Sequence, residues 1–183
     1  HIQTLIDADD FIEYQVAQIY FGNMDWPGDN IKYWRPKHAY GKWRWLLFDT
    51  DFGFARWDYN PFSFNTLEFA TEPDGPEWPN PPWSTLFLRK LLENTDFRRD
   101  FIIRFATDLN TIFRPERVID TINRMQAAIE LDMPAHQELW GGSMEQWYGE
   151  VEVLVDFAAN RANHVRRHIM AKFRLESTLD LGL

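Results

Sequence analysis

The sequence predicts an α+β fold that is predominantly α-helical, with one β-hairpin followed by a helical bundle. Two observations predict it. Apolar residues repeat at helical spacing through most of the second half, as in Phe97, Phe101 and Phe105, which lie four residues apart. Two short runs rich in β-forming residues, 31–35 and 42–49, flank a turn. Because 183 residues suffice for one domain with a real core, we expect a single domain over 1–183.

The first predicted element is a helix over residues 9–21. Asp9 and Asp10 supply the acidic first turn that favours a helix start, and apolar residues follow at helical spacing. Gly22 then stands where a helix commonly ends. We expect the aromatic side chains of this helix to pack in the core.

The hairpin is predicted from the runs 31–35 and 42–49, joined by the six residues from Pro36 to Gly41. Antiparallel strands joined by a short turn bring the start of the first strand beside the end of the second. Asn30 is therefore expected to lie near Asp49 and Asp51, although about 20 residues separate them in the chain.

Residues 54–82 are rich in Pro, Asn and aromatic residues and show no sustained periodicity. A loop of this length inside a compact domain is often a lid or a binding segment. The alternative is an irregular cover whose aromatic side chains face the helices. The sequence leaves both interpretations open.

The remaining region, 83–176, is predicted to be a helical scaffold. We expect Ser84, Thr95 and Ser143 to act as helix caps, and a short turn to precede Gly141. The expected helices lie over 84–94, 96–113 and 115–133, followed by a long final helix that reaches Phe173.

Composition excludes several classes of protein. The net charge of −9 argues against a general affinity for nucleic acid or anionic membranes, and it suits a protein that gathers divalent cations. The absence of cysteine excludes disulfides and zinc–thiolate sites. No apolar run approaches the roughly 18–20 residues that span a bilayer, so we expect no membrane insertion. The chain begins at His1 without a signal-peptide pattern, and we expect it to be a fragment.

The chemistry is expected in the two acidic loops that flank the hairpin. Asp25 and Asn30 lie five residues apart in the first loop, and Asp51 follows the second strand. Phosphoryl transfer needs a carboxylate for the proton of the attacking hydroxyl, and an amide oxygen and a further carboxylate for Mg²⁺. Since Mg²⁺ takes few carboxylates plus waters, this set of side chains is adequate.

The motif DWPGDN resembles the protein-kinase catalytic loop, in which an Asp is followed by an Asn five positions later, and TDFGFAR resembles the kinase metal-binding segment. The wider pattern resembles the CotH family of atypical protein kinases. The stretches that carry this resemblance are NMDWPGDNIKYWR, KWRWLLFDTDFGF, FLRKLLENTDFRRDFIIRF and FAANRANHVRRHI. It implies a protein-kinase-like C-terminal lobe in a secreted or cell-surface bacterial protein that phosphorylates protein Ser or Thr hydroxyls, using ATP and Mg²⁺ or Mn²⁺.

The resemblance also implies roles for individual residues. Asp25 matches the catalytic Asp, while Asn30 and Asp51 match the metal ligands through which the nucleotide is held. Asp49 is the second half of an Asp-x-Asp pair. Because side chains alternate along a strand, we expect only one of Asp49 and Asp51 to face the metal, with Asp51 preferred. Asp29 is expected to be a solvated loop residue.

Some positions depart from the kinase pattern. Asn23 and Met24 replace the usual His-Arg, and Pro27 replaces the loop lysine. Candidate substitutes for that lysine are Lys42, Arg44 and Arg56. A glycine-rich phosphate loop is also lacking, so the chain is expected to be the C-terminal lobe without an N-terminal lobe and to have little kinase activity alone.

Two other classes of protein remain as alternatives. One is a non-catalytic carbohydrate- or protein-binding surface module with an acidic metal site, and the other is a glycoside hydrolase that uses paired carboxylates. The kinase interpretation requires Asn30 and the Asp51 carboxylate to lie within about 5 Å of each other, close enough to share one metal.

Overall fold

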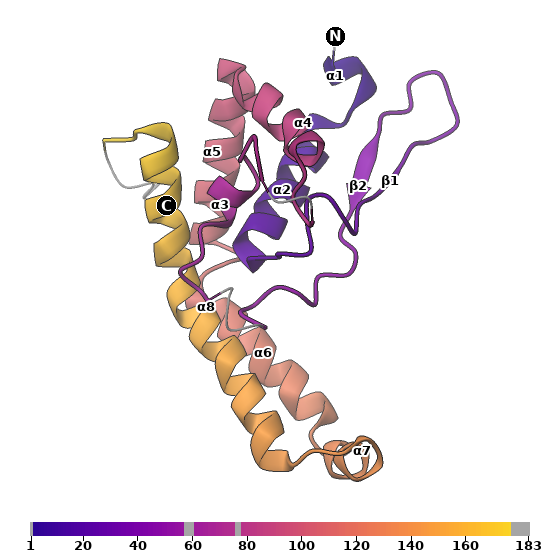
Figure 1. Cartoon of the computed structure of the whole chain (residues 1–183), viewed down its shortest axis with the longest axis vertical. Coiled ribbons are helices and arrows are strands. Elements are labelled where there is room, and N and C mark those ends of the chain that lie inside the picture. The colour runs from indigo at the N-terminus through magenta and orange to yellow at the C-terminus, as the bar shows by residue number, and fades with distance from the viewer. Residues whose placement is uncertain (1, 57–60, 76–77, 177–183) are drawn as a thin grey trace.

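The computed structural model describes residues 2–56, 61–75 and 78–176. It is mostly helical with one two-stranded antiparallel sheet, which confirms the predicted α+β class (Figure 1). None of the described helices is long and apolar enough to cross a membrane. The elements in chain order are α1 Ile2–Leu5, α2 Ala8–Phe21, β1 Lys32–Trp34, β2 Arg44–Leu46, α3 Thr66–Phe69, α4 Pro82–Leu92, α5 Thr95–Asn110, α6 Pro115–Ile129, α7 Met133–Trp140 and α8 Met144–Phe173.

Helix α2 lies at the centre of the core. Its aromatic side chains Phe11, Tyr14 and Tyr20 are buried there, as predicted. Val16 and Tyr20 are fully buried, and the Tyr20 ring stacks on Phe113 with centroids 3.9 Å apart. The helix begins one residue earlier than predicted, after the Asp7 carboxylate, which accepts the Asp10 N–H at 3.4 Å. It ends at Gly22, whose φ of 67° is the left-handed conformation that favours glycine.

The hairpin forms where predicted, but its strands contain only three residues each. Lys32 pairs with Leu46 and Trp34 with Arg44. Strands of this length are marginal alone, and contacts to the start of α2 support them. The Asp10 carboxylate accepts the Trp45 N–H at 2.7 Å, and the Trp45 ring lies 4.6 Å from that of Phe11. The second strand ends at Leu46 instead of residue 49, because Leu46 already pairs with Lys32, the first residue of β1.

The segment 54–82 is less irregular than predicted, because it contains the single turn α3. Leu67 and Phe69 point inward and are buried, as expected for a packed cover, whereas Trp78 is 58% exposed. The described parts therefore include a packed cover at Leu67 and Phe69, and the interpretation of the segment as a lid or binding segment stays a prediction. Residues 57–60 and 76–77 lie outside the described residues.

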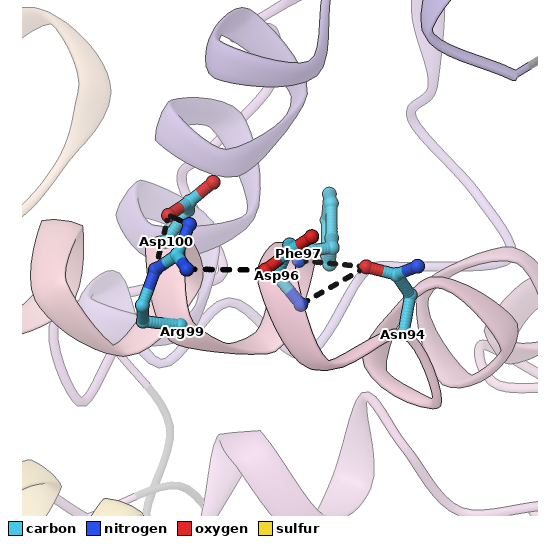
Figure 2. A network of polar contacts seen from close by, with 5 residues as sticks. All are labelled: Asn94, Asp96, Phe97, Arg99 and Asp100. Carbon is cyan, nitrogen blue, oxygen red and sulfur yellow. Dashed lines mark hydrogen bonds and ion pairs between the residues drawn. The ribbon is translucent and has the colours of Figure 1, made fainter.

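The caps were predicted correctly at one of three positions. Ser143 accepts the Gln146 N–H at 3.1 Å and caps α8. Ser84 and Thr95 lie inside α4 and α5, so their prediction as caps was wrong. Asn94 caps α5 instead, accepting the N–H groups of Asp96 and Phe97 at 3.1 and 3.0 Å (Figure 2). Asn is among the best N-cap residues, and it precedes Thr95 directly.

The last three helices form an arm. Helix α6 packs along the first half of α8, and both extend away from the rest of the protein (Figure 1). At the far end, the short turn predicted before Gly141 is the eight-residue helix α7. Helix α6 begins at Pro115 as predicted and ends at Ile129, earlier than the expected 133.

Arg161 on α8 connects the arm to the core. Its guanidinium is fully buried and donates five hydrogen bonds of 2.7–2.9 Å. Its acceptors are the backbone carbonyls of Ile19, Tyr20, Phe62 and Phe64 and the Thr66 hydroxyl. No carboxylate is among these acceptors, and burial lowers the Arg161 pKa to about 10.

We predict that Arg161→Met destabilises the protein by at least about 3 kcal/mol, because several buried acceptors then lose their donor at about 1–3 kcal/mol each. Arg167→Met, on an exposed position of the same helix, is the matched control and is expected to change the free energy of unfolding by less than about 0.5 kcal/mol. Urea unfolding followed by circular dichroism measures both. Equal stability of the two variants would contradict the central role of Arg161.

Candidate active site in the acidic loops

The first acidic loop leaves the end of α2 and is held by a chain of buried amides. Gln18 donates from Nε2 to the Tyr14 hydroxyl at 3.3 Å and accepts from Asn23 Nδ2 at 2.9 Å. Asn23 in turn accepts the backbone N–H of Asp25 at 3.0 Å. Gln18 and Asn23 are fully buried, so the backbone at Asp25 is fixed from inside the core.

The Asp25 side chain lies against that of Asn30, five residues further along the same loop. The Asn30 amide donates to Asp25 Oδ2, while Asp25 Oδ1 is buried and has no hydrogen-bond partner. Asn30 adopts a left-handed φ of 51°, and its backbone N–H donates to Asp29 Oδ1 at 2.9 Å. Strained backbone conformations of this kind concentrate at functional sites.

Gly28 holds the same loop against the segment before α4. Its N–H donates to the Pro79 carbonyl at 2.7 Å. A Cβ atom at this position would collide with that carbonyl oxygen and with the Pro81 ring. Only glycine therefore permits the close approach of the two segments.

The second acidic loop differs from the prediction. The strand ends at Leu46, so Asp49 and Asp51 do not alternate across a strand, and the expectation that only one of them can face the site loses its basis. Asp49 has a left-handed φ of 51°, and its carboxyl group lies close enough to that of Asp51 for the latter to raise its pKa. The structure thus brings the two carboxylates together.

This loop is also fastened to the end of α2. The Phe54 N–H donates to the Phe21 carbonyl at 2.7 Å, and the Phe54 ring lies 4.8 Å from that of Phe157 on α8. A Cβ at Gly53 would lie 2.9 Å from the Phe21 carbonyl oxygen, which explains the need for glycine. Both acidic loops therefore begin or pack at one helix end.

The carboxylates of the two loops influence each other. The pKa of Asp25 is raised, first by burial and then by the charges of Asp29, Asp49 and Asp51, while the Asn30 hydrogen bond opposes the shift. The pKa of Asp49 is also raised, by desolvation and then by the hydrogen bond and charge of Asp51. A cation placed among these groups would relieve the repulsion.

The described residues contain no group of three or more acidic or histidine side chains arranged to hold a metal ion. The oxygen donors present, two adjacent carboxylates and an amide, still suit Mg²⁺ or Mn²⁺, because such ions complete their coordination with waters and substrate phosphates. The two acidic loops interact through Asp25, because the Asn30 amide donates to it and the charges of Asp49 and Asp51 raise its pKa.

Arg44 is one of the residues proposed to replace the loop lysine of other kinases. It forms an ion pair with Asp7 instead, to which its Nη2 donates at 2.6 Å. Arg56 lies 4.0 Å from Glu150 on α8. The cation that the sequence did not indicate is Lys32, whose charge opposes the rise in the pKa of Asp49 and whose Nζ lies 3.1 Å from the centroid of the Phe48 ring. The hairpin register, which pairs Lys32 with Leu46 at the end of β2, is the signal that could have found it.

The raised pKa of Asp25 predicts a pH dependence. Since the folded state binds this proton more tightly than the unfolded state, the repulsion is present at neutral pH and is relieved as the pH falls. Asp25→Asn should therefore be more stable than the wild type at pH 7, by less than about 1 kcal/mol because Asp25 is partly exposed. This advantage should shrink between pH 7 and pH 4 in urea unfolding.

The control is Asp120→Asn, an exposed carboxylate on α6 paired with Arg124. It should show no such advantage at pH 7. A stability of Asp25→Asn below that of the wild type at pH 7, or an advantage that grows on acidification, would contradict the repulsion.

Comparison with known proteins identifies the family of the segment that contains both acidic loops. A family model described as CotH kinase protein matches residues 1–165, which include both acidic loops and most of α8. No curated protein and no solved structure matched the chain. The resemblance drawn from the sequence is thereby confirmed, and the chain belongs to the CotH kinase family.

Proposed function

We propose that this chain carries the catalytic base and metal ligands of a protein kinase that transfers phosphate from ATP to Ser or Thr hydroxyls with a divalent metal ion. The observation that supports the proposal is the environment of the Asp25 carboxylate. Asn30 holds one of its oxygens, while the other is buried, unpaired and surrounded by further acids. In this proposal the region is a protein-kinase-like C-terminal lobe of a secreted or cell-surface bacterial protein.

Asp25 acts as the base in this proposal. The acceptor hydroxyl donates its hydrogen bond to Asp25 Oδ1, and its oxygen attacks the γ-phosphorus as the bond to the ADP oxygen breaks. The proton passes to Asp25, whose raised pKa favours that transfer. Asn30 keeps the carboxylate oriented through Oδ2 during the step.

Asn30, Asp51 and Asp49 would hold the metal, with Asp49 and Asp51 acting as a pair. Asp51 raises the pKa of Asp49 by its proximity, and two neighbouring carboxylates of this kind would offer adjoining oxygens to one cation. When bound, the metal neutralises charge on the nucleotide phosphates. Lys32 lies beside Asp49 and supplies a second positive charge at the same end of the hairpin.

Metal binding gives the first test. Because the pKa of Asp49 is raised, protons compete with a cation for this carboxylate on acidification, and Mn²⁺ binding should weaken as the pH falls. Asp51→Asn and Asp49→Asn should each weaken Mn²⁺ binding at least about tenfold, measured by electron paramagnetic resonance of free Mn²⁺. Asp120→Asn is the control. Unchanged binding in both site variants would exclude the pair as metal ligands.

The kinase activity is tested in the full-length protein that contains this chain, with radiolabelled ATP, Mn²⁺ and a protein acceptor. Asp25→Asn should lower kcat by about 10²–10⁴, the range for loss of a general base. Asp51→Asn should raise the Mn²⁺ concentration required, and Asp120→Asn should leave kcat unchanged. Full activity of both Asp25→Asn and Asp51→Asn would reject the kinase assignment and favour a binding module.

A further inference from the structure

A cavity of about 530 Å³ lies between α2, the hairpin and α4, and none of the proposed catalytic or metal-binding residues lines it. Eight aromatic side chains of the described part of the chain line its walls. They include Phe11 from α2, Trp26 from the first acidic loop, Trp83 and Phe87 from α4, and three rings of the hairpin. Cavities of this size with mostly apolar walls are typical of small-molecule sites.

One polar side chain in this mostly apolar wall, that of Gln15, is buried and has an oxygen without a partner. Gln15 lines the cavity, is only 5% exposed, and its Oε1 atom has no hydrogen-bond partner. A buried acceptor without a donor costs about 1–3 kcal/mol, so a ligand that supplies an N–H gains from filling this position. Two other polar groups of the wall have partners, since Ser84 donates to the Pro81 carbonyl at 2.7 Å and the Tyr14 hydroxyl accepts from Gln18.

The lining also defines which ligands do not fit. Among the described residues it contains no Asp, Glu, Lys, Arg or His side chain, so a charged molecule would find no charged partner among them. A sugar would stack well on the tryptophan rings, but most of its hydroxyls would remain unpaired in a wall with so few polar groups. A flat uncharged ring can pack against the aromatic side chains of the wall, and one N–H donor on that ring can bind Gln15 Oε1.

We propose that this cavity binds a small, uncharged, planar aromatic molecule that carries one N–H donor, with that N–H directed to Gln15 Oε1. The ligand would contact Trp26, which is 1% exposed and adjoins Asp25 in the chain. Occupancy would therefore support the loop that bears Asp25. The binding itself does not depend on the kinase assignment.

Indole and 1-methylindole, which has the same ring but no N–H, test the proposal on the whole chain. Binding is followed by chemical-shift changes of the Trp indole N–H signals in ¹H–¹⁵N NMR spectra. Indole should bind about tenfold more tightly than 1-methylindole, the difference made by one hydrogen bond of ordinary strength. In Gln15→Met, which keeps the volume but removes the acceptor, the two affinities should become equal.

A pair of exposed tryptophans provides a matched control that does not endanger folding. Trp83 is 64% exposed and lines the cavity, whereas Trp78 is 58% exposed and does not. Trp83→Ala should weaken indole binding severalfold, and Trp78→Ala should leave it unchanged. ATP with Mn²⁺ should not displace indole.

Four results would overturn the proposal. They are the absence of indole binding to the folded wild type, equal affinity for the two probes, an unchanged preference in Gln15→Met, and displacement of indole by ATP. The last result would make the cavity part of the nucleotide site.

Discussion

The end of helix α2 is the position on which the rest of the structure depends, and the buried Arg161 guanidinium secures it. The last carbonyls of a helix have no partners within the helix and carry its partial negative charge, so a cation is favourable there. Arg161 donates to two of these carbonyls and, with its remaining N–H groups, to the segment around Phe64. One side chain thus joins the core helix, the irregular cover and the long last helix.

Both acidic loops are placed by this same helix end. The first leaves it at Gly22 and is fixed by the buried amides of Gln18 and Asn23. The second packs on it through the backbone hydrogen bond between Phe54 and Phe21. Carboxylates that repel one another can be held together in this way only because the supporting contacts are buried and satisfied. The departure from the usual kinase pattern at Asn23 therefore has a structural role in this protein.

The hairpin links the acidic site to the aromatic cavity. Its end near Lys32 approaches Asp49, while its rings form one wall of the cavity together with α2 and α4. Trp26 belongs to both regions, because it follows Asp25 in the chain and is buried in the cavity wall. A group bound in the cavity would thus touch the loop that presents the proposed base, which gives the two sites a direct physical connection.

Much of this structure could be predicted from local patterns. The sequence by itself determined the helix ending at Gly22, the hairpin, the amphipathic helix α5 and the family, because helical periodicity, turn residues and short motifs act over a few residues. The tertiary structure alone decided the length of the strands, the meeting of Asp49 with Asp51, and the roles of Lys32, Gln15 and Arg161. Arg161 and Tyr20 are 141 residues apart in the chain, and no local pattern encodes a contact over that distance. Burial and hydrogen-bond satisfaction select such contacts only when the whole chain is folded.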